Sequence, residues 1–200
     1  QLEGHLALMG QVHDMVYRKE IKGERVPNEA KIYSIYEQHA DIIVKGGREV
    51  QFGHKVDLCS GKSNLILNCQ VLRGNPRDSE LFIPALDAVV ESYGQAPRDC
   101  VTDGGYASLL NQSYAKEKGT TNIVFNKIVG SLNNVISSKN METRLKKWRS
   151  GAEAIISNVK RGYNLCRCTW KGWEHFVSKV LWSVIAYNIR VMTAHVVMLV

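Results

Sequence analysis

With 200 residues, the chain is long enough for one well-buried domain with a helical appendage. Its 44% apolar and 22% charged residues exclude a disordered or low-complexity protein. The five cysteines form no C-x-x-C pair, so a zinc site and a disulfide framework are disfavoured and a cytoplasmic protein is favoured. The formal net charge of +7 favours a polyanionic partner.

Residues 1–30 are predicted to form a helix followed by a segment that ends it. Apolar residues recur at helical spacing up to Val16, and Gly23 and Pro27 then end the pattern. The sequence begins without a Met and without the features of a signal peptide. We therefore interpret residues 1–30 as the helical remnant of an upstream region.

Residues 31–126 alternate between strand and helix patterns. Three runs rich in Ile, Val, Tyr and Phe cover residues 31–75 and are separated by a Gly46-Gly47 turn and a Ser-Gly-Lys-Ser turn. The elements that follow are a helix, a strand, a helix and a strand, at residues 78–94, 98–103, 108–119 and 122–126. This order predicts an α/β fold, in which helices flank a mixed five-stranded sheet and the C-terminal part is helical.

Two long helices are predicted in the last third, over residues 140–164 and 173–197. The second is strongly apolar, but Lys179, Asn188 and Arg190 interrupt it. We therefore predict a buried amphipathic helix rather than a membrane span. Eleven Lys and Arg residues against three acidic residues between positions 139 and 190 make this part basic, as expected for contact with phosphates.

Two acidic residues stand out by their surroundings. Asp103 ends the predicted strand 98–103 and is followed by two glycines, which is either a simple Asp-Gly turn or a carboxylate placed at a sheet edge. Glu153 shares a helix face with Arg149 and Lys160, which is either a surface salt bridge or a carboxylate embedded in a basic stripe. Local spacing leaves both alternatives open.

Four segments, in order, carry a resemblance to a known family: FGHKVDLCSGKSNLI, GNPRDSELFIPAL, TDGGYAS and the stretch from Met141 to Met192. Together they resemble the catalytic domain of DDE transposases from bacterial insertion sequences, which has a ribonuclease H-like fold. The resemblance covers about residues 31–195 and implies that residues 31–200 form this catalytic domain.

The resemblance also implies three catalytic carboxylates that bind metal. In the family the second acid begins a D-x-G-Y type of motif, and the third lies in the pattern Tyr-x2-Arg-x3-Glu-x6-Lys. The residues that match these two motifs are Asp103, Gly105, Tyr106, Arg149, Glu153 and Lys160. Lys146 stands where the second pattern has Tyr, so one supporting contact of the family is missing here.

The first acid has two candidates, Glu37 and Asp41, because the resemblance places it on the first strand, next to the fourth. Glu37 ends the run Ile32 to Tyr36 as Asp103 ends its own strand, whereas the usual family residue is Asp. On a strand the two would share a face at a separation of about 13 Å, too far apart to serve one metal pair unless the strand bends. An acid upstream of this sequence is a third alternative.

The resemblance implies DNA cleavage and strand transfer with two Mg²⁺ or Mn²⁺ ions. The partners it implies are the double-stranded DNA of element ends and target, with a homodimer possible in the DNA complex and no membrane. The basic residues expected at the DNA are Arg149, Lys160, Arg161, Lys146, Lys147 and Lys171. Two alternatives stay open: an inactive DNA-binding remnant of a transposase, and a ribonuclease H-like nuclease without strand transfer.

Overall fold

The computed structural model describes residues 2–27, 30–45, 49–128 and 130–197. The helices are α1 (Leu2–Val16), α2 (Asp78–Tyr93), α3 (Leu109–Glu117), α4 (Lys139–Gly162) and α5 (Trp173–Val197). The strands are β1 (Asp41–Lys45), β2 (Glu49–Gly53), β3 (Val56–Ser60), β4 (Ile66–Val71), β5 (Asp99–Asp103) and β6 (Asn122–Asn126). A π-helical turn, η1 (Tyr17–Ile21), extends α1, and a 3₁₀ turn, η3 (Gly104–Tyr106), follows β5.

These helices begin and end where the sequence provides capping groups. The hydroxyl of Ser138 accepts a hydrogen bond from the Met141 amide at the start of α4, and Ser108 does the same for Asn111 at the start of α3. Gly94 ends α2 in the left-handed conformation, at φ 73°, and its amide bonds the Val90 carbonyl. The sequence predictions for these helices are therefore confirmed.

The strands form three separate pairs in the part of the chain that the structure describes. β1 with β2 and β3 with β4 are antiparallel hairpins, and β5 runs parallel to β6 with Asp103 opposite Asn126. The predicted Ser-Gly-Lys-Ser turn joins β3 to β4, whereas the predicted Gly46-Gly47 turn lies outside the described residues.

A single five-stranded sheet is therefore not observed. The stretch from residue 31 to 40 forms no strand, and β1 pairs only with β2. As a result, no described strand lies between β3 and β5, whose residues line two sides of one cavity. The structure agrees with the coarser prediction of a mixed α/β domain with a helical C-terminal part.

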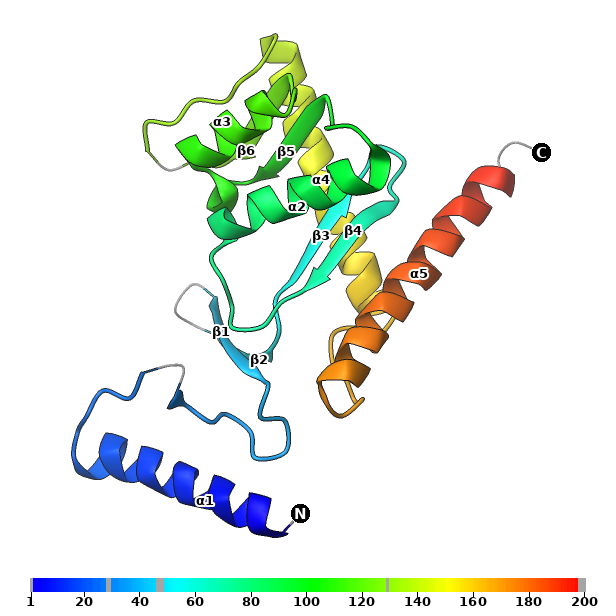
Figure 1. Cartoon of the computed structure of the whole chain (residues 1–200). Coiled ribbons are helices and arrows are strands. Elements are labelled where there is room, and N and C mark those ends of the chain that lie inside the picture. Colours follow the sequence, from blue (N-terminus) through cyan, green and yellow to red (C-terminus); the bar gives the residue numbers. More distant parts are fainter. Residues whose placement is uncertain (1, 28–29, 46–48, 129, 198–200) are drawn as a thin grey trace.

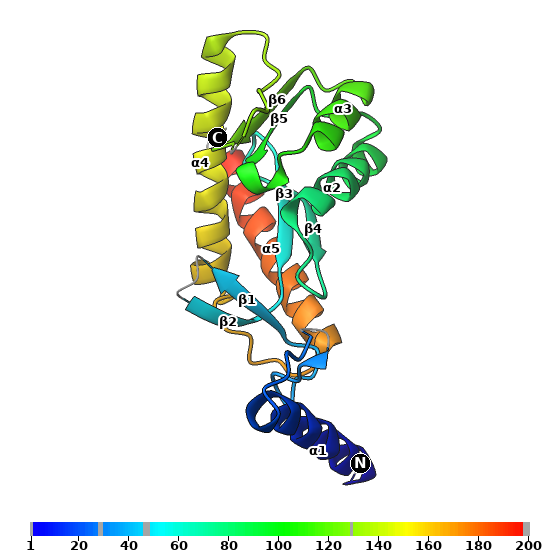
Figure 2. The same cartoon turned by 90° about the vertical axis from the view of Figure 1, so that its left-hand side faces the viewer.

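Two apolar clusters hold the domain together. One joins β4, α4 and α5 through Ile66, Ile155, Val159, Val184 and Tyr187. The other joins α2, α3 and β6 through Phe82, Leu86, Ala115, Ile123 and Phe125. Around the β5–β6 pair, α4 lies on one side while α2 and α3 lie on the other (Figure 2).

The N-terminal helix α1 lies at one end of the molecule, beyond the β1–β2 hairpin and away from the other helices (Figure 1). Leu8 is its buried residue, whereas Leu2, Leu6 and Met9 are exposed. The interpretation of residues 1–30 as a remnant of an upstream region stays a prediction.

The last helix, α5, packs on the domain with one face. Its Asn188 side chain bonds both the amide and the carbonyl of Ile66 at 2.9 Å, and Val180 and Tyr187 are buried. By length and composition, α5 is also apolar enough to cross a membrane, with a mean hydropathy of 1.4 over its most apolar window. In the structure, 28% of that window is buried. The opposite face is apolar but exposed, with Trp182, Ile189 and Met192 all more than half exposed, so the prediction of a buried helix holds for one face only.

Candidate active site

Asp103 lies at the end of β5, where the chain must turn sharply. A Cβ on the next residue, Gly104, would lie 2.5 Å from the Lys127 carbonyl oxygen and 2.6 Å from that of Asn126. Only glycine fits this close approach of two backbone segments. The side chain of Asp103 is half exposed, at 51%, so the turn leaves the carboxylate accessible at the edge of the β5–β6 pair.

Arg149 on α4 brings Asp103 and Glu153 together. Its Nη2 atom donates a hydrogen bond to Asp103 Oδ2, and its Nη1 atom lies 3.4 Å from Glu153 Oε1. The guanidinium is only 11% exposed, whereas Glu153 is 69% exposed. Two carboxylates from different elements thus share one cationic group, and carboxylate oxygens are the ligands that Mg²⁺ and Mn²⁺ prefer.

Helix α4 fixes this geometry because its buried stripe lies next to Arg149. Leu145, Ile155 and Val159 are buried at helical spacing. Arg149 follows Leu145 by one turn and is only 11% exposed, whereas Glu153, one further turn along, is 69% exposed. The predicted face shared by these two residues is therefore observed. Asp103, which lies 46 positions before Arg149, reaches the same guanidinium through the tertiary fold.

A cavity of about 500 Å³ adjoins this site, and Asp103 and Arg149 are among its lining residues. Strand β3 lines one side and β5 another, and α2 and α4 contribute apolar side chains such as Phe82, Leu86 and Ile155. The cavity therefore has a mainly apolar lining, to which charged residues such as Asp57, Lys62 and Arg98 also contribute.

The cysteines of this region provide a first testable prediction. Burial raises the pKa of Cys59 and of Cys100 to about 12 and that of Cys69 to about 11, so at pH 8 these thiols stay protonated and unreactive. Cys166 is exposed. We expect a short iodoacetamide pulse at pH 8 to alkylate Cys166 at least tenfold faster than Cys100, measured by peptide mass spectrometry.

The same pulse in denaturant serves as the control and should label all five cysteines equally. Fast labelling of Cys100 in the folded chain would contradict the packing between β5 and α2.

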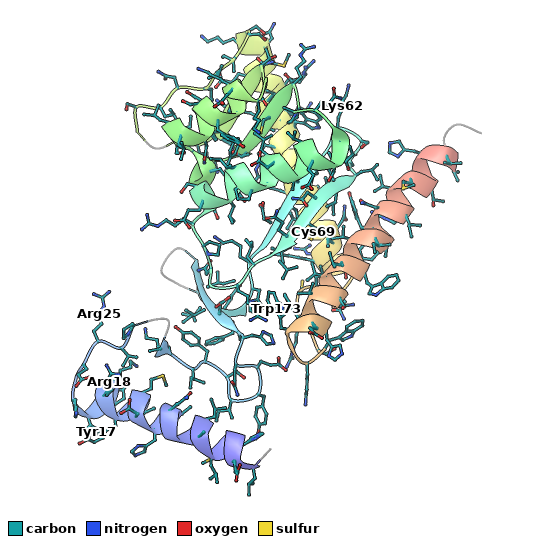
Figure 3. The ribbon with its side chains drawn as sticks, in the orientation of Figure 1. Tyr17, Arg18, Arg25, Lys62, Cys69 and Trp173 are labelled. Atoms are coloured by element: carbon teal, nitrogen blue, oxygen red, sulfur yellow. The ribbon has the colours of Figure 1, made fainter. Side chains whose placement is uncertain are left out.

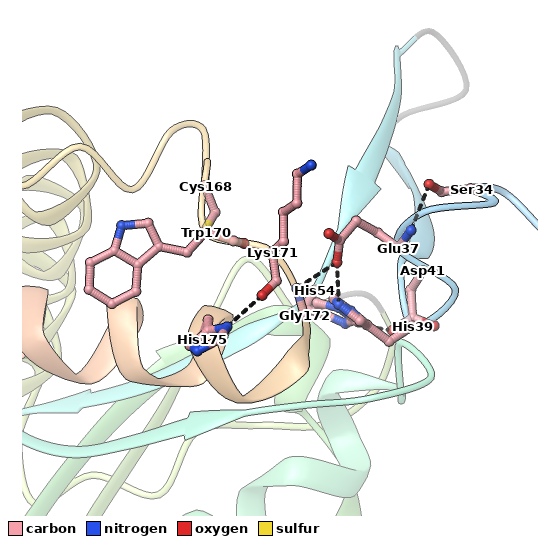
Figure 4. A network of polar contacts seen from close by, with 10 residues as sticks. All are labelled: Ser34, Glu37, His39, Asp41, His54, Cys168, Trp170, Lys171, Gly172 and His175. Carbon is pink, nitrogen blue, oxygen red and sulfur yellow. Dashed lines mark hydrogen bonds and ion pairs between the residues drawn. The ribbon is translucent and has the colours of Figure 1, made fainter. Parts of the chain in front are cut away.

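Glu37 and Asp41 lie in a separate network, linked by two histidines (Figure 4). His39 bonds Glu37 Oε2 and His54 at 2.7 Å each, and His54 bonds Asp41 Oδ2 at 3.0 Å. The Gly172 amide donates to Glu37 at 2.9 Å and lowers the pKa of this carboxyl, with His39 contributing less. The network thus ties the segment before β1 to the start of α5.

Aromatic rings enclose this network. Trp173 is the first residue of α5 and lies near the β1–β2 hairpin (Figure 3). Its ring meets that of His54 edge-on, with the ring centroids 4.9 Å apart. Phe176 lies 5.0 Å from the same imidazole, and burial lowers the pKa of His54. Glu37 lies in the turn before β1 and Asp41 begins β1, so the two acids are bridged by imidazoles and not spaced along one strand as expected from the sequence.

The described residues contain no group of three or more His, Cys, Asp or Glu side chains placed to hold a metal ion. Asp103 and Glu153 fit a divalent cation by their chemistry, but a third carboxylate does not join them in this conformation. The first acid of the site thus stays a prediction.

The predicted DNA-binding residues lie mainly on the surface of α4 and just after it. Lys146 makes an ion pair with Glu142 at 2.7 Å, whereas the Arg149 guanidinium is engaged by the two acids. The remaining residues of this set are all exposed: Lys147, Lys160, Arg161 and Lys171.

Sequence reasoning did not identify Asp57, which the structure places on the cavity wall. Its carboxylate is buried at 7% exposure, and Tyr106 donates a hydrogen bond to its Oδ1 atom at 2.6 Å. The sequence signal that could have identified Asp57 is its position as an acidic residue between Val56 and Leu58, inside a mostly apolar strand.

A model of the transposase DDE domain family matches residues 43–189. The match covers 147 of the 200 residues. The chain belongs to this family. No curated protein and no solved structure was found to match it. The matched range includes Asp57, Asp103 and Glu153, and it begins after Glu37 and Asp41.

Members of the transposase DDE domain family act on DNA, and the family generally uses divalent metal ions. The convergence of Asp103 and Glu153 agrees with this chemistry.

Proposed function

We propose that the chain catalyses metal-dependent DNA cleavage and strand transfer of an insertion sequence element. The observation that carries this proposal is the convergence of Asp103 and Glu153 on Arg149, beside an accessible sheet edge. Membership of the transposase DDE domain family supports it independently.

Asp103 and Glu153 would hold divalent cations, two Mg²⁺ or two Mn²⁺. Such ions activate a water or a 3′-hydroxyl and stabilise the leaving oxygen during phosphodiester displacement. Arg149 has a different role, because its single positive charge offsets part of the charge of both acids in the observed conformation. Once cations replace that charge, its guanidinium is released for the bidentate contact with phosphate to which arginine is suited.

Exposed Lys147, Lys160, Arg161 and Lys171 would contact the backbone of double-stranded DNA, at element ends and at the target. Lys146 joins them once DNA phosphates compete with Glu142 for its charge. A homodimer on DNA, a cytoplasmic location and no membrane partner complete the proposal.

The strand that would carry the first acid is proposed to enter the cavity that residues of β3 and β5 line. The run Ile32 to Tyr36 is uncharged, as expected for a strand covered on both faces, yet Ile35 and Tyr36 are 41% and 85% exposed. Entry of this run parallel to β5 would pair it with two strand edges and bring Glu37 beside Asp103. This favours Glu37 over Asp41 as the first acid.

We expect Glu37→Gln to weaken Mn²⁺ binding at least tenfold, measured by calorimetry, and Asp41→Asn to preserve it. We also expect Mn²⁺ to slow hydrogen exchange of the amides of residues 32–36, because strand entry would give them backbone partners. Loss of binding in Asp41→Asn alone would make Asp41 the first acid, and unchanged binding in both variants would place that acid elsewhere.

The activity is tested with a duplex oligonucleotide that carries the element end and a supercoiled plasmid as target. Nicked plasmid together with oligonucleotide joined to plasmid, both dependent on Mg²⁺ or Mn²⁺, is the expected result. Nicking without joined product would indicate a nuclease without strand transfer. DNA binding without nicking would indicate an inactive remnant.

A further inference from the structure

The hydrogen bond between Tyr106 and Asp57 joins two strand pairs that share no ladder. Tyr106 ends η3, the turn that follows Asp103 directly, and Asp57 is the second residue of β3. Their contact measures 2.6 Å and spans 49 positions of the sequence. It therefore connects the turn that follows Asp103 to strand β3, and both residues line the cavity.

Burial keeps the Tyr106 phenol protonated, so it can act as the donor in this contact. Burial, and then the hydrogen bond to Asp57, raises the pKa of Tyr106 far above its usual value, so the phenol stays a donor. Burial likewise raises the pKa of Asp57. The second oxygen, Asp57 Oδ2, has no hydrogen-bond partner among the described residues, so the bond from Tyr106 is the main polar contact of a buried carboxyl group.

A second link, from Lys55 just before β3, supports the same turn. Lys55 Nζ bonds Asp78 Oδ1 at 2.8 Å, and a Cβ on Gly105 would lie 2.5 Å from Asp78 Oδ2. The Tyr106 carbonyl in turn accepts a hydrogen bond from Asn111 at 2.8 Å. The turn after Asp103 is thus clamped on several sides: the Tyr106 ring packs on the apolar cluster of α2, α3 and β6, and its hydroxyl donates to Asp57.

We infer that Asp57 and Tyr106 are positioning residues that set the orientation of the Asp103 carboxylate. This inference rests on the proposed role of Asp103 in metal binding. Asp57 and Tyr106 would not themselves contact the metal or DNA. Tyr106 lies three residues after Asp103, so its effect on the carboxylate would be transmitted through the backbone of η3. Groups that orient a metal ligand in this way typically change metal affinity by about 10- to 100-fold when removed.

The test uses Tyr106→Phe, which removes one hydroxyl group and keeps the ring. We expect Mn²⁺ affinity to fall about tenfold and hydrogen exchange of residues 104–107 to accelerate at least fivefold. Asp57→Ala should cause the same losses as Tyr106→Phe, and the double variant should lose no more than either single variant. Asp57→Asn should keep most of the Mn²⁺ affinity, because its amide oxygen still accepts the hydrogen bond from Tyr106.

Tyr114→Phe is the matched control. Tyr114 donates a comparable hydrogen bond to Asp87 at 2.7 Å, between α3 and α2. We expect it to lower the unfolding temperature as Tyr106→Phe does, with Mn²⁺ affinity unchanged. Equal effects of the two variants on Mn²⁺ affinity, or unchanged exchange at residues 104–107 in Tyr106→Phe, would overturn the inference. If the wild type bound no Mn²⁺ while Tyr106→Phe still loosened this turn selectively, the proposed function would fail and the positioning role would be supported.

Discussion

Asp103→Asn is expected to abolish DNA cleavage and strand transfer, with a loss of about a thousandfold or more. The variant keeps the size and shape of the side chain but removes the charge of a carboxylate that, with Glu153, would bind a divalent cation. The metal contributes several kcal/mol to transition-state stabilisation, and about 4 kcal/mol corresponds to a thousandfold in rate. The measurement is the formation of nicked and joined plasmid under single-turnover conditions.

Asp87→Asn serves as the control for this variant. Asp87 is exposed to a similar degree, with a side-chain exposure of 45% against 51% for Asp103. It lies on α2, where it accepts a hydrogen bond from Tyr114. We expect its activity to stay within about threefold of the wild type, since surface changes away from the site have small effects. Wild-type activity in Asp103→Asn would remove this residue from the catalytic machinery.

Phe125→Ala is expected to have the largest effect on stability, about 3–5 kcal/mol in the free energy of unfolding. Phe125 is 1% exposed on β6, and its ring lies 5.9 Å from that of Phe82 on α2. Its removal leaves a cavity between strand and helix and costs the transfer free energy of the ring. Urea denaturation followed by circular dichroism measures the change.

Phe52→Ala provides the comparison, because Phe52 on β2 is 63% exposed. We expect its free energy of unfolding to change by about 0.5 kcal/mol or less. If Phe125→Ala is too unstable to purify, Phe125→Leu is expected to lose a smaller amount, about 1–2 kcal/mol. Equal losses for Phe125→Leu and Phe52→Ala would contradict the assignment of Phe125 to the core.

The helices and most strands of this chain were predictable because their signals are local. The apolar spacing of α4, its Ser138 cap and the i to i+4 relation of Arg149 and Glu153 are all contained in one continuous segment. Likewise, the Asp-Gly-Gly sequence after Cys100 to Thr102 marks the end of β5 without reference to any other part of the chain.

The features that were not predictable depend on contacts between distant segments. The run Ile32 to Tyr36 has the composition of a strand. Whether it pairs depends on the edges of β3 and β5, and the local sequence of the run contains no information about those edges. The partnership of Asp57 with Tyr106 is non-local in the same way, as is the network that joins Glu37 to Gly172 across 135 positions. These contacts determine the arrangement of the acids, so the first acid could not be chosen from sequence alone.

The most direct test of a metal-dependent transposase site in this chain is calorimetric titration of Mn²⁺ into the wild type, Asp103→Asn and Glu153→Gln. Binding by the wild type that is lost in both variants is the expected result, because each variant removes one of the two carboxylates that converge on Arg149. Absence of Mn²⁺ binding in the wild type, or equal binding in all three proteins, would contradict a catalytic metal site at Asp103 and Glu153.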